Sequence, residues 1–242
     1  MKKLLFSLFF MLPLLALANE GAQLDHAPID LKDQASLQRG ARTFVNYCLN
    51  CHSAAYMRYN RLKDIGLTDA QIKDNLLFAG KKVGDTMTVS MPTKDAKNWF
   101  GVAPPDLTVI ARARGADWLY SYMRSFYRDN TTQTGWNNTV FDKVAMPHVL
   151  WQLQGQQVLK VKEKTDASGL KIESHVLELD KPGSLLPDEY DAMVADLVNF
   201  LVYLGEPAQS QRKSLGLIVL LFLGLLFVLT YYLKKEFWKD IH

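Results

Sequence analysis

The stretch Cys48-Leu49-Asn50-Cys51-His52 decides how this sequence is interpreted. Its two cysteines are the only ones among 242 residues, and a histidine directly follows the second. C-x-x-C-H is the attachment signature of haem c. Two thiols one helical turn apart can each form a thioether with a vinyl group of the porphyrin, and the adjacent histidine can then bind the iron. The motif therefore predicts one haem c, attached through Cys48 and Cys51, with His52 as a ligand.

Other uses of a C-x-x-C pair fit this sequence less well. A thioredoxin-like redox pair opens a helix after a strand, whereas this motif lies at the end of a predicted helix. A zinc site would need two more ligands, but there is no third cysteine and the other histidines are scattered. A disulfide between cysteines this close would close almost no loop and would add little stability.

Methionine is the usual second axial ligand in electron-transfer cytochromes, because a thioether favours Fe(II). Met57 lies too close to the motif, and Met123 and Met193 fall within helical patterns, where they fill a core. Met91 and Met146 differ, because each precedes a proline in an irregular segment, which suits a rigid ligand loop. The residues alone leave the choice between these two open.

The two ends of the chain carry export and membrane signals. Two lysines precede an apolar run that closes with Ala-Leu-Ala, which predicts a cleaved signal peptide over residues 1–18. Residues 214–233 contain no charge and are long enough to span a bilayer. With an exported N-terminus, residues 19–213 form an extracytoplasmic domain, and residues 234–242 form a cytoplasmic tail.

Composition excludes several other classes of protein. The net charge of the chain is only +3, which argues against nucleic-acid binding, because that needs a basic surface. Two cysteines cannot build a scaffold of several disulfides. We find no cluster of acid, base and nucleophile that would make this chain catalytic by itself.

Periodicity predicts a mostly helical domain. Apolar spacing and end signals indicate four helices, at residues 34–48, 68–78, 116–128 and 187–204. Two β-rich runs, near 157–162 and 171–179, predict a small hairpin with its turn at Asp166-Ala167-Ser168-Gly169. Residues 81–110 and 129–155 are expected to be irregular loops, and loops of this length usually wrap something or have a function.

Three further segments resemble the cytochrome c1 family, the haem subunit of ubiquinol–cytochrome c reductase, the cytochrome bc1 complex. Pro104-Pro105-Asp106-Leu107-Thr108 resembles its P-P-D-L-[ST] motif, Arg112-Ala113-Arg114 its R-A-R segment, and Val144-Ala145-Met146-Pro147 the segment with its axial methionine. The likeness spans essentially the whole mature chain and is strongest to the proteobacterial form. It implies a mostly α c-type cytochrome fold with irregular haem-wrapping loops, in which the first and last helices cross. The hairpin would be an insertion, and one C-terminal transmembrane helix would complete the chain.

The resemblance also assigns roles to residues. It makes Met146 the distal ligand, which settles the choice left open above. It makes Arg114 the partner of a haem propionate, a role that suits a guanidinium. Trp118 falls near the family's aromatic propionate partner, which is often tyrosine. Pro104 or Pro105 lies where a backbone carbonyl accepts from the axial imidazole and so fixes its orientation.

For function, the resemblance implies a one-electron carrier, a non-catalytic redox subunit of an enzyme complex. It would accept an electron from the Rieske iron–sulfur protein and pass it to a soluble or membrane-tethered c-type cytochrome. Cytochrome b would be its neighbour in a dimeric complex of the bacterial cytoplasmic membrane, with the haem domain in the periplasm. The alternatives are a membrane-anchored monohaem cytochrome c of another respiratory chain, such as an oxidase subunit, a haem protein with an open sixth site, and a haem-free thiol protein.

Overall fold

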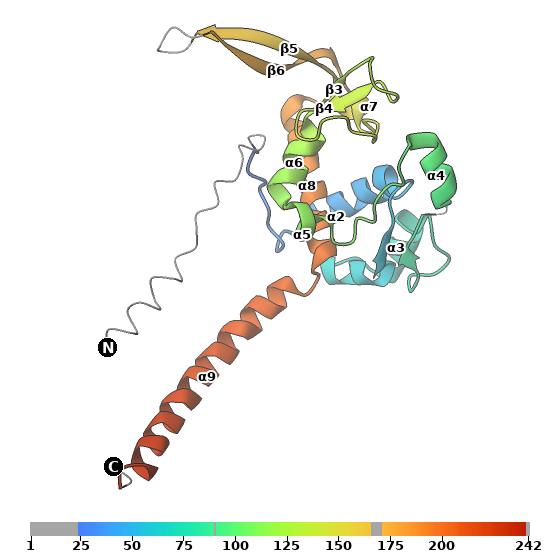
Figure 1. Cartoon of the computed structure of the whole chain (residues 1–242). Coiled ribbons are helices and arrows are strands. Elements are labelled where there is room, and N and C mark those ends of the chain that lie inside the picture. The colour runs from blue at the N-terminus through green and yellow to red at the C-terminus, as the bar shows by residue number, and fades with distance from the viewer. Residues whose placement is uncertain (1–23, 90, 166–170, 241–242) are drawn as a thin grey trace.

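The computed structural model describes residues 24–89, 91–165 and 171–240. The predicted signal peptide at residues 1–18 and the predicted turn of the hairpin lie outside these ranges. About half of the described residues are helical, which agrees with the predicted fold class, and the strands pair in antiparallel two-stranded sheets. Figure 1 shows a helical body with a hairpin extending from one end and a long helix from the other.

Two helices from opposite ends of the domain form the centre of the body. α2 spans Gln34–Thr43 and continues through a π-helical turn over Phe44–Cys48, which confirms the first predicted helix. The Asp33 carboxylate caps α2 by accepting a 3.0 Å hydrogen bond from the backbone N–H of Ser36. α8 spans Pro187–Gly205 and starts at a proline, as predicted.

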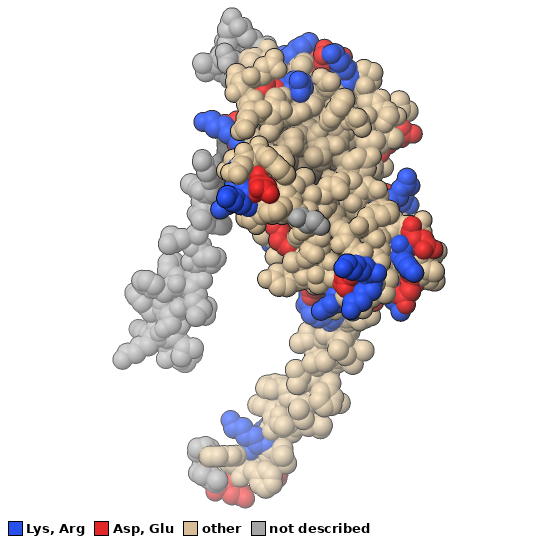
Figure 2. All heavy atoms as spheres, turned by 90° about the vertical axis from the view of Figure 1, so that its right-hand side faces the viewer, with Lys and Arg blue, Asp and Glu red and all other residues tan. Residues whose placement is uncertain are grey.

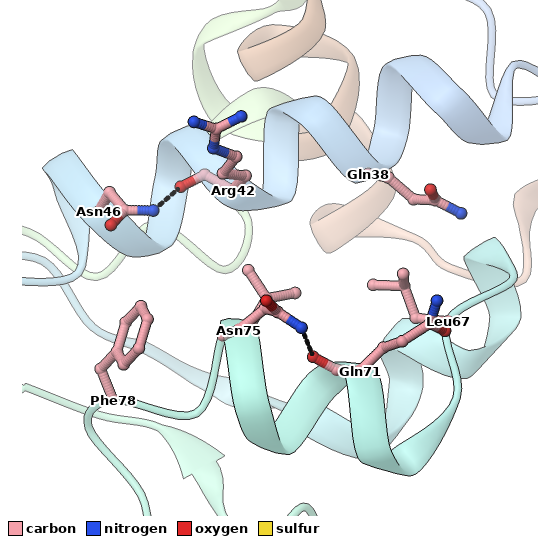
Figure 3. Close-up of a pocket in the computed structure, with 8 residues that line it drawn as sticks. Gln38, Arg42, Asn46, Leu67, Gln71, Asn75 and Phe78 are labelled. Atoms are coloured by element: carbon pink, nitrogen blue, oxygen red, sulfur yellow. Dashed lines mark hydrogen bonds between the residues drawn. The ribbon is translucent and has the colours of Figure 1, made fainter.

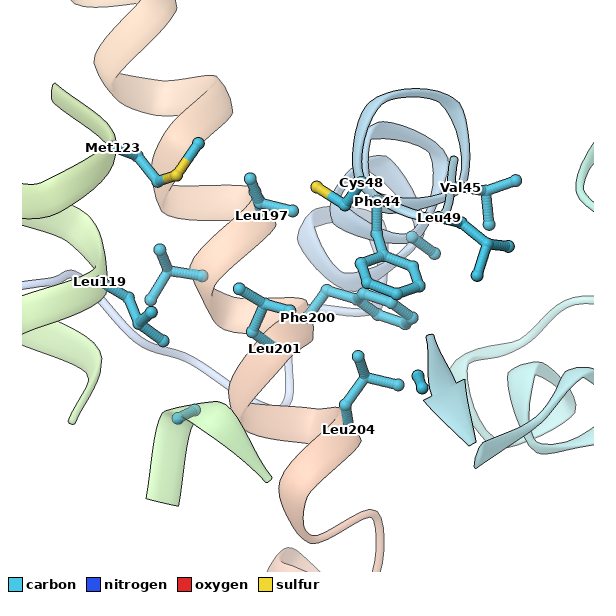
Figure 4. Packing of buried hydrophobic residues seen from close by; sticks show 14 of the residues in the cluster. Phe44, Val45, Cys48, Leu49, Leu119, Met123, Leu197, Phe200, Leu201 and Leu204 are labelled. Carbon is cyan, nitrogen blue, oxygen red and sulfur yellow. The ribbon is translucent and has the colours of Figure 1, made fainter. Parts of the chain in front are cut away.

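Gly40 of α2 packs directly against the backbone of α8. A Cβ atom there would lie 2.0 Å from the carbonyl oxygen of Asp196, so this approach requires glycine. Beside it, the rings of Phe44 and Phe200 are fully buried with their centroids 5.7 Å apart (Figure 4). Burying an aromatic side chain contributes about 1.5–3 kcal/mol. The crossing therefore fixes the end of the helix that carries the C-x-x-C-H motif.

α6 (Ala116–Arg124) is held against α8. Arg124 donates two hydrogen bonds of 2.6 Å to the carboxylate of Asp191 on α8. The hydroxyl of Tyr190, also on α8, donates to the backbone carbonyl of Met123 at 2.8 Å. Charge-assisted, two-point contacts of this kind fix orientation as well as distance. These contacts therefore fix the position of α6 and of the side chains on its other faces.

The helix predicted over 116–128 is shorter in the structure. It ends with α6, and the residues that follow form β3 (Phe126–Arg128), which pairs with β4 (Trp136–Asn138). In this register Phe126 lies opposite Asn138. The aromatic-rich sequence suits a helix and a strand equally, and the pairing with β4 decides between them.

The remaining elements are short and surround the helix pair. The hydroxyl of Thr68 caps α3, which confirms its predicted start, although α3 ends before the predicted Phe78. The two regions predicted to be irregular contain several short elements, separated by loops. The remaining short elements are β1 (Ala54–Arg58), a 3₁₀ helix (Tyr59–Ile65), α3 (Asp69–Asn75), β2 (Thr86–Met87), α4 (Thr93–Phe100), α5 (Ile110–Arg114) and α7 (Trp151–Gln154).

The predicted hairpin is present and is longer than expected. β5 (Gly155–Thr165) pairs with β6 (Lys171–Pro182) and projects from the body (Figure 1). On one face Lys160 and Lys162 both bind the carboxylate of Glu178, with N–O distances of 2.6 and 2.7 Å. These ion pairs cross the two strands and hold the ribbon together beyond the point where it leaves the body.

The C-terminal helix stands apart from the domain. α9 spans Gln209–Phe237 and contains the predicted membrane span at 214–233. Its apolar side chains, Leu220 and Phe227 among them, are exposed rather than packed on the body. A helix that is apolar on all sides and long enough to cross a bilayer is stable when lipid surrounds it.

Candidate haem-binding site

The C-x-x-C-H segment forms a tight turn at the end of the first helix. The backbone N–H groups of Cys51 and His52 both donate to the carbonyl of Cys48, at 3.1 and 2.8 Å. Residues three apart in such a turn share a face, so the turn suits the attachment of both cysteines to one group. The cysteines are free thiols, and burial raises the pKa of Cys48 to about 12. The pair is not a disulfide.

The histidine of the motif is held in the tautomer that a metal ligand needs. Nδ1 of His52 lies 2.7 Å from the carbonyl oxygen of Pro105. A carbonyl can only accept, so Nδ1 carries the proton and Nε2 keeps its lone pair. Burial lowers the pKa of His52 and outweighs the opposing effect of the Pro105 carbonyl, which favours the neutral imidazole. Of the two prolines considered from the sequence, the structure brings Pro105 to the histidine.

The P-P-D-L-T segment binds the chain that follows the motif. The Asp106 carboxylate accepts from the N–H of Ala55 at 2.8 Å, and the N–H of Leu107 donates to the carbonyl of Ser53 at 2.8 Å. Asp106 also accepts from the N–H of Thr108 at 2.8 Å, which folds the segment into an Asx turn. The sequence analysis gave Asp106 no role. An aspartate two residues before a threonine, after two prolines, was the available signal for this turn.

The predicted distal ligand lies in a loop that α6 and β4 hold. Met146 is half-buried. Asn138, which is 1% exposed, donates to the carbonyl of Tyr122 on α6 at 2.8 Å. Its amide oxygen accepts from the N–H groups of Val140 and Phe141, at 2.8 and 3.1 Å. One buried asparagine thus ties the start of the methionine loop to α6, a role that sequence reasoning missed.

A tyrosine contacts the sulfur of the predicted distal ligand. The Tyr122 hydroxyl donates to Sδ of Met146 with a separation of 3.5 Å. The ring of Tyr122 stacks on Trp118, with centroids 4.7 Å apart, and meets Phe126 edge-on at 5.0 Å. Burial raises the pKa of the Tyr122 phenol, which therefore stays a neutral O–H donor. Tyr122 was not among the predicted site residues.

The two arginines of the R-A-R segment have different partners. Arg112 pairs with Glu206, with an N–O distance of 3.4 Å. The guanidinium carbon of Arg114 lies 5.1 Å from the ring centre of Trp118 and 5.8 Å from that of Phe141. Within the described ranges, no carboxylate pairs with Arg114, and its side chain is exposed. The structure therefore brings Arg114 and Trp118 together and leaves this guanidinium able to bind an anion.

Comparison with known proteins identifies the family. The chain matches the model of the Cytochrome C1 family over residues 25–169 and 185–241. The chain belongs to the cytochrome c1 family. It is 51% identical to cytochrome c1 of Allochromatium vinosum over 100% of both chains. It is 54% identical to a Nitrosomonas europaea protein named ammonia monooxygenase gamma subunit, over 93% of this chain and 92% of that one. A Bradyrhizobium diazoefficiens protein named cytochrome b/c1 is 28% identical over 89% of this chain and 34% of its own length.

Members of the cytochrome c1 family carry a covalently bound haem c, and Cys48 and Cys51 are this chain's only cysteines. The side chains described above fit that group. They provide free thiols in one turn, an imidazole with a free Nε2, a thioether, and an exposed guanidinium against an aromatic ring. Together with the family, the apolar helix α9 identifies this protein as membrane-anchored.

The cytochrome c1 domain also has two hollows in its described surface. A groove of about 540 Å³ between α2 and α3 is lined mainly by amide side chains and Arg42 (Figure 3). A second hollow, of about 680 Å³, lies beside β3, β4 and the start of the methionine loop. Neither is lined by His52 or Met146. On the face that carries α4, most Lys, Arg, Asp and Glu side chains gather at the margins and leave the hollowed centre uncharged (Figure 2).

Proposed function

We propose that this protein is the one-electron carrier of a quinol–cytochrome c reductase. The proposal rests chiefly on one observation, the fixed imidazole of His52. Its Nδ1 is bound to Pro105 and its Nε2 is free. With haem c attached at Cys48 and Cys51, this nitrogen supplies the proximal ligand. The bound group provides reversible Fe(III)/Fe(II) chemistry, and the protein's part is to set its ligands, its potential and its access.

Met146 supplies the distal ligand in this proposal. Its loop is tied to α6 through the buried Asn138, and its sulfur accepts from Tyr122. A thioether opposite an imidazole favours Fe(II) and closes the sixth position, which suits electron transfer rather than oxygen or substrate chemistry. The alternatives with an open sixth site do not account for a methionine held in this way.

Arg114 and Trp118 are proposed to hold a haem propionate. Burying a carboxylate without a partner is costly, and a guanidinium with free donors removes that cost. Arg112, two residues away on α5, already pairs with Glu206. In this proposal Arg112 binds Glu206 within the protein, and Arg114 binds the cofactor.

The partners are proposed from the family and from the relatives' names. The Bradyrhizobium diazoefficiens relative is named cytochrome b/c1, which supports cytochrome b as the membrane neighbour of α9. The Rieske iron–sulfur protein is the proposed electron donor, and a soluble or tethered c-type cytochrome is the proposed acceptor. The complex is proposed to be dimeric. The haem domain is proposed to lie on the periplasmic side of the bacterial cytoplasmic membrane, which the predicted signal peptide and α9 support.

A reduced-minus-oxidised difference spectrum tests this function. The protein is solubilised mildly from its native membrane and captured through a tag. We expect a c-type band together with b-type bands, because cytochrome b is captured too. A c-type band alone, under conditions that preserve a known membrane complex, would favour an oxidase-linked cytochrome. Capture of monooxygenase subunits without b-type haem would instead support the name of the Nitrosomonas europaea relative. A variant with Cys48→Ser and Cys51→Ser is the control and should lose the c-type band.

A further inference from the structure

The hydroxyl of Tyr122 approaches the sulfur of Met146 in a setting that leaves it little freedom. Its oxygen lies 3.5 Å from Sδ, a normal distance for a hydrogen bond to the large sulfur atom. Its ring is stacked on Trp118 and contacts Phe126 edge-on, and the residue is 8% exposed. The backbone carbonyl of Tyr122 also accepts from Asn138. Both ends of this residue are therefore fixed relative to the methionine loop.

We propose that Tyr122 is a positioning residue that raises the reduction potential of the haem through its hydrogen bond to Met146. This inference rests on the proposed role of Met146 as distal ligand. It goes beyond it by naming the residue that sets how strongly the sulfur donates to the iron.

The physical reason lies in the two lone pairs of a thioether sulfur. One lone pair is available for the iron, and the other accepts the proton of Tyr122. The positive end of the O–H dipole draws electron density from the sulfur, which then donates less to the iron. Weaker donation destabilises Fe(III) more than Fe(II), because the oxidised iron depends more on donated charge. Hydrogen bonds near the axial ligand are a recognised means of tuning haem potential.

The surrounding rings explain why a single hydroxyl can have this effect. His148, which is 1% exposed, stacks on Phe126 with centroids 4.8 Å apart, and Phe126 in turn contacts Tyr122. This aromatic packing excludes water from the side of the phenol that faces the protein. In a medium of low polarity, the O–H dipole acts on the sulfur with little screening.

Tyr122→Phe in the intact membrane complex is the test, because it removes the hydroxyl and keeps the ring contacts with Trp118 and Phe126. Spectroscopic redox titration should give a midpoint potential below that of the unaltered protein, with the c-type haem content unchanged. Tyr120→Phe is the matched control. It removes a hydroxyl two residues away on the same helix, where the ring lies under Arg124, and should leave the potential unchanged. An unaltered or raised potential in Tyr122→Phe would overturn the proposal.

A second measurement separates this inference from the ligand assignment on which it rests. Carbon monoxide binds a ferrous haem that lacks its distal ligand. We expect ferrous Tyr122→Phe to exclude carbon monoxide as the unaltered protein does, so its lower potential reflects a tuned ligand rather than a lost one. Carbon monoxide binding by Tyr122→Phe would overturn the tuning role and show that the hydroxyl only retains the methionine. If Met146→Leu changed neither the potential nor carbon monoxide binding, the ligand assignment itself would fail.

Discussion

The two sides of the proposed haem site are built in different ways. On the proximal side, His52 belongs to a tight turn that a second short segment holds, through the backbone of Pro105 and Leu107 and the carboxylate of Asp106. On the distal side, Met146 belongs to a loop whose position depends on side chains from other elements, chiefly Asn138 and Tyr122. The first arrangement relies mainly on backbone groups, including those of a segment 53 residues from His52 at the Pro105 contact. The second relies on side chains.

This difference indicates which side of the site should tolerate side-chain substitutions and which side should be altered by them. Backbone hydrogen bonds to a turn depend little on the identity of most side chains. A loop tied by a buried asparagine and a phenol depends on those two residues. We therefore expect substitutions on the distal side to alter ligation and potential as well as stability, and substitutions on the proximal side to alter stability with little change in potential.

The largest expected effect comes from removing the distal ligand. Met146→Leu should open the sixth position, lower the midpoint potential and allow the ferrous protein to bind carbon monoxide, because leucine has no donor atom. Optical spectra with and without carbon monoxide would measure this. Met91→Leu is the control, since Met91 also precedes a proline but has no proposed contact with the haem. A ligand-loss spectrum in Met91→Leu rather than Met146→Leu would reverse the assignment.

The second largest effect is expected from replacing Asn138, which ties the methionine loop to α6. Asn138→Ala should lower the free energy of unfolding by about 2–4 kcal/mol, because it leaves the buried Tyr122 carbonyl and two part-buried loop N–H groups without their partner. It should also admit carbon monoxide partially. Chemical denaturation of the haem-loaded protein measures the first effect. Asn75→Ala, at an exposed residue whose amide bonds within its own helix, should change stability far less.

A smaller effect is expected on the proximal side. Asp106→Ala removes the acceptor for the N–H groups of Ala55 and Thr108 and should cost about 1–2 kcal/mol of unfolding free energy. The midpoint potential should barely move, because the Pro105 carbonyl still holds His52. Denaturation and redox titration of the same sample give both quantities. A large fall in potential with unchanged stability would contradict the proposed division between the two sides.

The smallest effect concerns the hairpin, which lies away from both ligands. Its two lysine partners lower the pKa of Glu178 from 4.5 to about 2. Because the folded pKa lies below the unfolded one, the ion pairs stabilise the hairpin above pH 4.5, and this contribution is lost as the pH falls towards 2. An NMR titration of the Glu178 carboxyl checks the shift. In the double variant Lys160→Met, Lys162→Met the midpoint should return towards its ordinary value, and an ordinary midpoint in the unaltered protein would contradict the expectation.

Much of the fold and of the proximal side was predictable because the signals are local. The periodicity of α2 and α8, the proline that starts α8 and the C-x-x-C-H spacing each act over a few residues. The length of α6 was not predictable in the same way, because the pairing of β3 with β4 ends that helix. The contacts of Tyr122 and Asn138 join side chains to groups in other elements or loops, 24 and 16 residues away. No local pattern marks them, since tyrosine and asparagine occur for many other reasons.

The most direct test of the account is the axial ligation of the unaltered protein in its native membrane complex. The ferric form should show the charge-transfer band of a thioether bound to haem iron, and the ferrous form should exclude carbon monoxide. That result would establish a closed site with one histidine and one methionine, as electron transfer requires. Absence of the band together with rapid carbon monoxide binding would contradict the account, because it would place an open iron where Met146 is proposed to bind.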